Sequence, residues 1–183
     1  MTAVVGVVDD THIWIGVDSL GSNIDTHFSV SVKTEKVFEV GEFLFGACGS
    51  YRTTNLLRHH LQDYLQIQHQ DESDEHFVHK TFLDAIFTCF KNGGALFEHN
   101  DNQSESAFLF GYRGSLYVCQ EDFSIQSFHD DYAATGAGRS ECLASMYSTK
   151  HLPSKERIKV ALEASSRYNI TVAPPFIIKS ILR

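Results

Sequence analysis

The sequence lacks the features of several common functional classes. Lysine and arginine never form a run longer than two residues, and the formal net charge of the 183-residue chain is -8. This balance gives little electrostatic support to nucleic-acid binding, because a phosphate backbone is bound mainly through clustered cations. No apolar run approaches the roughly 20 residues that a membrane-spanning helix needs. We therefore expect neither a nucleic-acid partner nor a membrane partner.

Signals for export and for disulfide bonding are also missing. The N-terminus has no basic region followed by a long apolar stretch, so no secretory signal is indicated. The cysteines are scattered and show no C-x-x-C spacing, which is typical of reduced, buried thiols in a cytoplasmic protein. They are Cys48, Cys89, Cys119 and Cys142. The length suits one well-buried core, and we expect a single domain over 1–183.

Metal and phosphate sites have weak support. The close histidine groupings, His59-His60 and His76 with His79, fall on or beside polar faces of expected helices and lack zinc-ligand spacing. We interpret them as solvated side chains, and we expect no metal ion and no other cofactor. Gly136-x-Gly138 could hold a phosphate, but it has no third glycine and no basic partner. A helix turn is therefore the favoured interpretation of that motif.

The stretch from Thr2 to Asp18 has the pattern of a β-hairpin. Two apolar runs rich in β-branched residues, Ala3–Val8 and Ile13–Val17, flank a polar break that begins at Asp9. A turn centred one residue later would place Thr2 directly opposite Asp18. Opposed residues in an antiparallel pair have Cβ atoms roughly 5 Å apart. The pattern therefore predicts a hydroxyl beside a carboxylate near the start of the chain.

A threonine at this position has a possible chemical role. Its hydroxyl is a poor nucleophile unless a nearby base removes the proton. If Met1 is removed, the freed α-amine of Thr2 can be that base, since its ordinary pKa is about 7.7–8.0. The plain alternative is that Thr2 only begins an edge strand.

The rest of the chain alternates pairs of strands with pairs of helices. We expect loops at Ser19–Asp25 and Glu98–Ser106, and helices at Arg52–Gln68, at Glu75–Lys91, after Gly136-Ala137-Gly138 and from Pro153. The expected strands are Phe28–Val32, Lys36–Val40, Phe43–Cys48, Ala107–Gly111, Ser115–Gln120, Ser124–Phe128, Tyr132–Thr135 and Phe176–Leu182. This order does not fit a doubly wound parallel sheet. It fits an α+β fold with two sheets packed face to face and a helical layer outside each.

At this point the sequence resembles the proteasome β-type family of N-terminal-nucleophile hydrolases. The family has a mature N-terminal threonine and an aspartate sixteen residues later, the separation of Thr2 and Asp18. Its second hairpin begins with a lysine and ends in a small-residue turn, as Lys36-Val37-Phe38-Glu39-Val40 and Gly46-Ala47-Cys48-Gly49-Ser50 do. The ending E-R-I-K-V-A-L-E-A-S, then V-A-P-P-F, is similar to small proteasome-like proteins of bacteria and their phages.

The resemblance implies a four-layer αββα sandwich that hydrolyses peptide or other amide bonds as a homo-oligomer. Thr2 would be the nucleophile, Lys36 would place a positive charge near its hydroxyl, and Asp18 would keep that lysine charged. The backbone N–H of Gly49 would stabilise the oxyanion. Lys33 is a rival for the lysine role. No ATPase partner can be identified from the sequence.

Some positions depart from the family pattern. Ala137 occupies the place of a common serine, and Tyr168-Asn169 stand where the family has a later aspartate. These departures motivate an alternative in which the chain is a non-catalytic subunit that acts in assembly or binding. Hydrolysis of a small-metabolite amide is a third possibility. Cys48 could be read as a thiol nucleophile, but it belongs to an apolar strand, and core packing is favoured.

Overall fold

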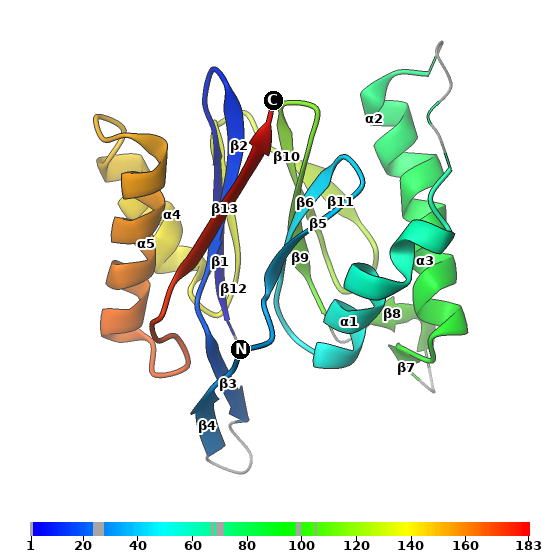
Figure 1. Ribbon diagram of the computed structural model, residues 1–183, viewed down its shortest axis with the longest axis horizontal. Helices are drawn as coiled ribbons and strands as arrows, with labels where there is room; N and C mark the ends of the chain where they lie inside the picture. Colours follow the sequence, from blue (N-terminus) through cyan, green and yellow to red (C-terminus); the bar gives the residue numbers. More distant parts are fainter. Residues whose placement is uncertain (1, 24–27, 67, 69–71, 98–99, 105) are drawn as a thin grey trace.

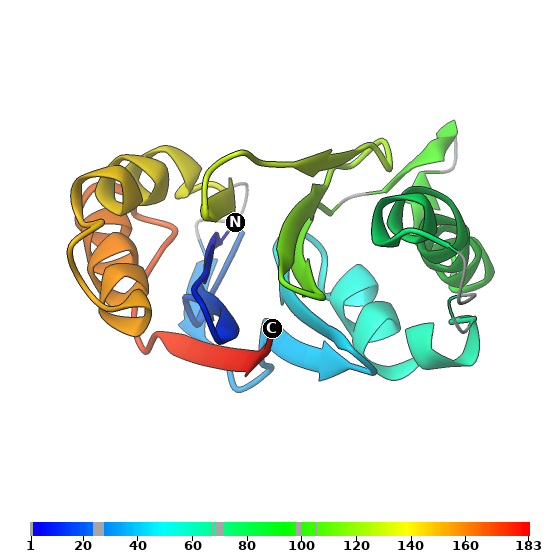
Figure 2. The ribbon, with the colours of Figure 1, turned by 90° about the horizontal axis from the view of Figure 1, so that it is seen from above.

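Two antiparallel sheets pack face to face between two layers of helices. The computed structural model describes residues 2–23, 28–66, 68, 72–97, 100–104 and 106–183. The order of layers is helices, sheet, sheet, helices, and it is clear both from the front and from above (Figures 1 and 2). This arrangement confirms the predicted four-layer αββα sandwich.

The first sheet contains the N-terminal hairpin at its centre. Its strand order is β12-β1-β2-β13, and α4 and α5 cover its outer face (Figure 1). The hairpin strands are fully or largely buried because helices lie on one side of them and the second sheet lies on the other. The bounds are β1 Ala3–Val8, β2 His12–Val17, β12 Tyr132–Gly136, β13 Ile177–Leu182, α4 Arg139–Ser148 and α5 Ser154–Tyr168.

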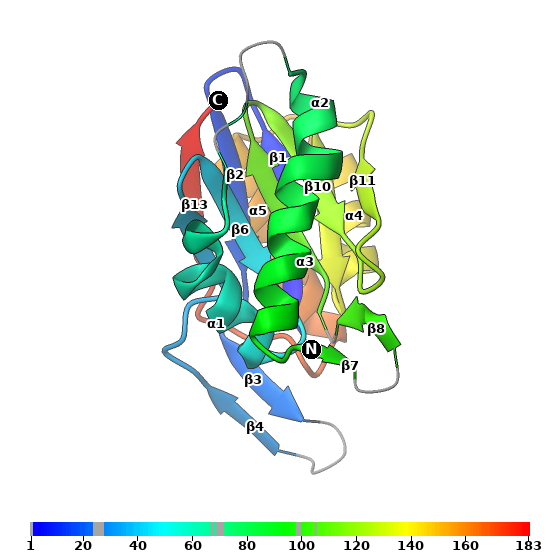
Figure 3. The same cartoon turned by 90° about the vertical axis from the view of Figure 1, so that its right-hand side faces the viewer.

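The second sheet has the order β11-β10-β9-β6-β5. The α3 helix lies over its outer face, with α1 beside it (Figure 3). The strands are β5 Val37–Val40, β6 Phe43–Ala47, β9 Phe108–Tyr112, β10 Ser115–Cys119 and β11 Ile125–Ser127. The helices are α1 Tyr51–His59, the 3-10 turn η1 Leu61–Asp63, α2 Asp74–Phe77, the π-type turn η2 Val78–Phe82 and α3 Leu83–Asn92.

Two segments predicted as loops contain strands. β3, Leu20–Asn23, pairs with β4, Phe28–Ser31, and this hairpin extends beyond the end of the sandwich (Figures 1 and 3). β8, Asn100–Ser104, pairs with β7, Leu96–Phe97. Residues 24–25, 98–99 and 105 of the two predicted loops lie outside the described residues. β3 and β8 are mostly polar or glycine, so no apolar alternation marked them.

The first expected helix is shorter than predicted. Helix α1 ends at His59, and η1 follows it, whereas the predicted helix continued to Gln68. Leu61 in the 3-10 turn remains fully buried. The apolar spacing therefore continues past the end of the helix, and periodicity alone could not locate that end.

The N-terminal hairpin has a register one residue different from the predicted one. Val4 pairs with Val17, and beyond this pair the Asp18 N–H donates to the Ala3 carbonyl at 3.4 Å. Asp18 therefore lies opposite Ala3, and the expectation that it lies opposite Thr2 was wrong.

The cause of the shift is a shorter turn. The Asp9 N–H donates to the His12 carbonyl at 2.9 Å, which leaves only Asp10 and Thr11 in the turn. The Asp9 carboxylate accepts from the N–H groups of Thr11 at 2.9 Å and His12 at 2.8 Å. An aspartate that satisfies turn amides in this way stabilises the tight conformation.

The sheets approach closely because glycine occupies the interface. A Cβ atom on Gly46 would lie 2.5 Å from Val4 Cγ1 and 2.7 Å from Ile15 Cγ2, distances at which atoms overlap. Larger residues at this position would separate the sheets. The hydrophobic contacts between the two inner faces therefore depend on the missing side chain.

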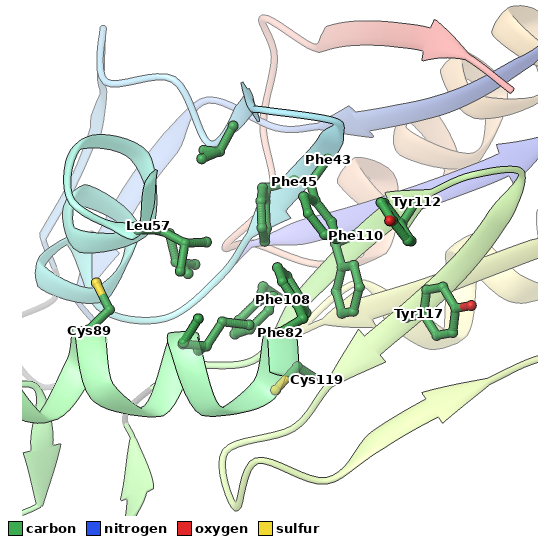
Figure 4. Packing of buried hydrophobic residues seen from close by; sticks show 14 of the residues in the cluster. Phe43, Phe45, Leu57, Phe82, Cys89, Phe108, Phe110, Tyr112, Tyr117 and Cys119 are labelled. Carbon is green, nitrogen blue, oxygen red and sulfur yellow. The ribbon is translucent and has the colours of Figure 1, made fainter. Parts of the chain in front are cut away.

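Stacked aromatic rings fill the space between the second sheet and its helices (Figure 4). The Phe43 ring lies 4.2 Å from the Phe82 ring and 4.4 Å from the Tyr112 ring, measured between centroids, with nearly parallel planes. Such pairs contribute beyond the area that they bury. None of the helices in the described residues has both the length and the apolarity needed to cross a bilayer.

Phe82→Ala should lower the free energy of unfolding by about 3–5 kcal/mol, because it removes a fully buried ring and leaves a cavity. Phe28→Ala is the matched control, since Phe28 is 58% exposed and its loss should change stability by less than about 0.5 kcal/mol. Urea unfolding measures both values. Equal losses in the two variants would contradict the assignment of the aromatic core.

Candidate active site

The N-terminal hairpin places Thr2 and Asp18 at the same end of the first sheet. Thr2 directly precedes β1 and is 3% exposed, while Asp18 directly follows β2 and is completely buried. The Asp18 carboxylate accepts from the Ala3 N–H at 3.1 Å and from the Leu20 N–H at 2.9 Å. These two backbone donors orient the carboxylate independently of its contacts with side chains.

Lys36 joins the two residues. Its Nζ donates to Thr2 Oγ1 at 2.9 Å, to both Asp18 carboxylate oxygens at 3.3 Å, and to the Leu20 carbonyl at 2.7 Å. Burial lowers the pKa of Lys36 below that of an ordinary lysine, while the charge of Asp18 and the hydrogen bond to it oppose the shift. The arrangement holds an ammonium group against the hydroxyl oxygen of Thr2.

The choice between the two candidate lysines follows from strand pairing. The Lys36 carbonyl accepts from the Ala47 N–H at 2.8 Å, which extends the β5–β6 pairing by one residue and fixes the Lys36 backbone. The Lys36 side chain is 5% exposed, whereas Lys33 is exposed. The structure therefore brings Lys36, and not Lys33, to Thr2.

Gly49 lies in the turn between β6 and α1, with φ near +99°, a conformation that favours glycine. The N–H groups on either side of it are occupied: Cys48 donates to the Ala107 carbonyl at 3.2 Å, and Ser50 donates to Ser106 Oγ at 2.9 Å. Within the described residues the Gly49 N–H has no protein acceptor, and Gly49 lines the same pocket as Thr2. This amide is available to a ligand.

Buried hydroxyl groups support the Gly49 turn, and no sequence pattern marked them. Ser106 and Thr53 contact each other through their side-chain oxygens, and both are almost completely buried. Ser104 Oγ donates to the Ser106 carbonyl at 3.0 Å. Ser104 and Ser106 belong to a segment that the sequence predicted as a polar loop. A serine in such a segment gives no signal that it is buried.

A small pocket opens beside the Thr2 hydroxyl. Its volume is about 160 Å³. A larger cleft of about 910 Å³ lies at the opposite end of the N-terminal hairpin, near Asp9 and Asp10, and contains none of the predicted site residues. The smaller pocket is lined by Thr2, Leu20, Gly21, Ser22, Lys36, Ala47, Cys48, Gly49, Ser50, Tyr51 and Thr54.

Cys48 reaches this pocket but lacks the properties of a nucleophile. Its Sγ donates to the Ala107 carbonyl at 3.1 Å, and burial raises the pKa of the thiol to about 11. A cysteine reacts as its thiolate, so this environment favours the core-packing interpretation. All four cysteines are buried and free of disulfide bonds.

The positions that depart from the family pattern lie together. Asn169 Nδ2 donates to the Ala137 carbonyl at 3.0 Å, and Asn169 Oδ1 accepts from the Thr171 N–H at 3.0 Å. The loop that contains Ala137 contacts the start of the chain, because the Gly138 N–H donates to the Thr2 carbonyl at 3.5 Å. A neutral amide therefore stabilises the backbone behind Thr2.

Possible metal ligands in the described part of the chain are not grouped near this site. In the ranges that the structure describes, no three histidine, cysteine, aspartate or glutamate side chains are placed so that they could hold a metal ion. The exposed His76 ring lies 3.8 Å from the Glu72 carboxylate, which is a single pair and not a cluster.

Known structures share the whole fold. No protein-family model matches the sequence, and no curated protein matches it. The Thiobacillus denitrificans protein BPH superposes with a TM-score of 0.78 at 18% identity, covering 98% of this chain and 97% of the other. Eukaryotic HslV from Trypanosoma brucei superposes with a TM-score of 0.74 at 9% identity, with 99% of each chain covered.

Anbu from Yersinia bercovieri, described as an ancestral β-subunit, gives a TM-score of 0.69 at 11% identity over 97% of this chain and 80% of the other. The chain has a proteasome β-type fold. At these identities the likeness concerns the fold. The proteasome-type sandwich places the N-terminal strand, the Lys36 strand and the Gly49 turn around one pocket.

Asp18→Asn should lower the free energy of unfolding by about 3–5 kcal/mol, because it leaves the buried Lys36 ammonium without its anion. Lys36→Met should have a similar effect, and the double variant should lose clearly less than the sum of the two. Urea unfolding of the four proteins completes the thermodynamic cycle.

The exposed pair Lys159 and Glu163, 3.7 Å apart on α5, provides the control for this cycle. Glu163→Gln should leave the unfolding midpoint unchanged within error, because exposed ion pairs contribute little. Strictly additive losses in the Asp18 and Lys36 variants would show that the buried pair is not coupled.

Proposed function

We propose that this protein is a threonine-type hydrolase that cleaves peptide bonds with Thr2 after removal of Met1. The observation that carries the proposal is the 2.9 Å contact between Lys36 Nζ and Thr2 Oγ1, with Asp18 as the counter-ion. A buried cation against a hydroxyl oxygen favours the alkoxide and so lowers the barrier to deprotonation.

The proposed reaction needs no group beyond the chain and one water molecule. Thr2 Oγ1 attacks the substrate carbonyl carbon while its proton passes to the α-amine of Thr2. The Gly49 N–H donates to the developing oxyanion, a contribution of about 2.7–4 kcal/mol for one such donor. The protonated α-amine of Thr2 then gives this proton to the substrate nitrogen, which leaves as an amine while the acyl ester with Thr2 forms. Water, deprotonated by the same amine, then hydrolyses the ester.

The proposed substrate is a peptide, and the proposed assembly is a homo-oligomer of single-domain chains in the cytoplasm. A solved structure of Thiobacillus denitrificans BPH contains epoxomicin, and that chain matches this one over 98% of its length. Small-metabolite amides share the same requirement for Thr2, Lys36 and Gly49. An ATPase partner is not assigned.

A non-catalytic role in assembly or binding is the second candidate. The observation that favours it is the neutral pairing of Asn169 with the Ala137 carbonyl, where the family pattern has a carboxylate and a hydroxyl. In that role the pocket would bind a ligand without covalent chemistry. Activity measurements on Thr2 variants distinguish the two functions.

Thr2→Ala should reduce peptide hydrolysis by at least about 10³-fold, because no other hydroxyl can be deprotonated at that position. The measurement uses a panel of fluorogenic peptides, together with the intact mass of the wild-type chain, which should lack Met1. Thr2→Ser is the conservative control and should retain part of the activity. Epoxomicin should inhibit the wild-type protein.

Two results would contradict the hydrolase. One is equal peptide hydrolysis by the wild type and by folded Thr2→Ala, with folding checked by circular dichroism. The other is the absence of hydrolysis by wild-type protein whose N-terminus is shown to be Thr2. The second result would support the binding role.

The dependence of kcat/KM on pH should be bell-shaped. Activity should rise as the α-amine of Thr2 loses its proton, near its ordinary pKa of about 7.7–8.0, and fall as Lys36 becomes neutral. Because the charge of Asp18 raises the pKa of Lys36, Asp18→Asn should move the falling limb to lower pH. A falling limb that stays in place would show that Lys36 does not control it.

A further inference from the structure

Ser106 closes a ring of hydrogen bonds around the backbone of Ser50. Its Oγ accepts from the Ser50 N–H at 2.9 Å and contacts Thr53 Oγ1, which in turn donates to the Ser50 carbonyl at 2.8 Å. A hydroxyl has one proton to donate. Because Thr53 gives its proton to the Ser50 carbonyl, Ser106 is the donor in the contact between the two side chains. The ring therefore runs in one direction, from the Ser50 N–H through Ser106 and Thr53 to the Ser50 carbonyl.

Both hydroxyl groups of this ring are shielded from water. Ser106 is 2% exposed and Thr53 is 1% exposed. A buried hydroxyl that loses its partner is costly, and hydrogen bonds in a connected chain strengthen one another. The backbone of Ser106 is held as well, because Ser104 Oγ donates to its carbonyl at 3.0 Å and the Ser104 N–H donates to the Glu121 carbonyl at 2.8 Å. The ring is therefore anchored to the segment that follows β10.

Gly49 depends on its neighbours for its orientation. Its φ of +99° lies in the region that favours glycine, and glycine adopts positive and negative φ with similar ease. The direction of its N–H is therefore set by the peptide groups on either side. The Cys48 N–H donates to the Ala107 carbonyl at 3.2 Å, and the Ser50 N–H donates to Ser106 Oγ. One dipeptide of the chain thus holds both sides of the glycine.

We infer that Ser106 is a positioning residue that keeps the Gly49 N–H directed at the carbonyl oxygen of the substrate. The inference rests on the proposed function, in which this N–H stabilises the oxyanion. The described lining of the Thr2 pocket does not include Ser106, so the serine acts through Ser50 and not by contact with a ligand. A donor that moves out of position still allows a peptide to bind, but it no longer stabilises the charge that develops in the transition state.

Ser106→Ala should lower kcat for a fluorogenic peptide by about 10-fold or more and leave KM within about threefold, because it weakens an interaction made in the transition state. Thr53→Val breaks the ring at its other hydroxyl and should have the same effect, so it also serves if Ser106→Ala does not fold. Thr53→Ser keeps that hydroxyl and should stay within about threefold of the wild type. In the double variant, kcat should remain within about threefold of the more impaired single variant.

Two ligands separate positioning from general damage to the site. A peptide aldehyde adds reversibly to Thr2 Oγ1, and its carbonyl oxygen then occupies the position of the oxyanion, whereas the matching peptide alcohol binds without reacting. Ser106→Ala should weaken the aldehyde by about 10-fold or more and the alcohol by less than about threefold. Ser148→Ala is the control, since it removes an exposed hydroxyl that donates to the Ala144 carbonyl within α4, and it should change neither affinity.

Three results would overturn the inference and leave the hydrolase intact. They are an unchanged kcat in folded Ser106→Ala, equal weakening of the aldehyde and the alcohol, and losses that multiply in the double variant.

Nuclear magnetic resonance tests the positioning without turnover. The backbone order parameter of the Gly49 amide should be about 0.85 in the wild type and should fall below about 0.6 in Ser106→Ala. The Ser50 amide should lose its protection from hydrogen exchange in the same variant. If a chain that begins at Thr2 shows these changes but hydrolyses nothing, the positioning role is supported and only the hydrolase fails. An order parameter that is the same in both proteins would overturn the inference whatever the activity.

Discussion

The buried ammonium of Lys36 is the constraint on which the candidate site depends. A charge taken out of water is strongly unfavourable unless an opposite charge and hydrogen-bond acceptors surround it. Asp18, Thr2 and the Leu20 carbonyl meet this requirement at 2.7–3.3 Å. They come from the start of β1 and from the segment after β2, so a single cation ties three parts of the chain together. The contacts that hold the Lys36 ammonium against Thr2 are also the contacts that offset the cost of burying this charge.

The sandwich supplies the rigidity that this constraint needs. Gly46 lets the two sheets approach until β1 and β6 are in contact, and the turn that follows β6 carries Gly49 into the pocket of Thr2. On the other side of the second sheet, stacked rings around Phe43 and Phe82 hold the helical layer. Helix α1 then begins at Tyr51, so the same element ends the Gly49 turn and limits the pocket. The packing of the core therefore fixes the positions of β6 and α1, and these two elements position the residues of the pocket.

Sequence patterns were sufficient to predict the layers of the fold. They were not sufficient for features that depend on single side chains, such as the register of a hairpin or the burial of a serine. The apolar runs predicted the hairpin that brings Thr2 and Asp18 to one end of a sheet, and the resemblance to the proteasome β-type family added Lys36 to them. The register of the N-terminal hairpin was not readable, because it depends on how Asp9 satisfies two turn amides. Polar strands such as β3 and β8 are held by backbone hydrogen bonds, and their composition resembles that of loops. The burial of Ser106 is a tertiary effect with no local signature.

The neutral pair Asn169 and Ala137 bears on the proposed mechanism through the charge that it lacks. A carboxylate close to an α-amine stabilises the protonated amine and raises its pKa. In the proposed mechanism the amine of Thr2 must be neutral to accept a proton, so a negative charge added close to it would leave a smaller fraction of the amine neutral near pH 7. Asn169 Nδ2 donates to the Ala137 carbonyl in the loop behind Thr2, a hydrogen bond that an ionised carboxylate could not make. The asparagine therefore supplies a donor to this loop and no charge, which suits both of the proposed roles.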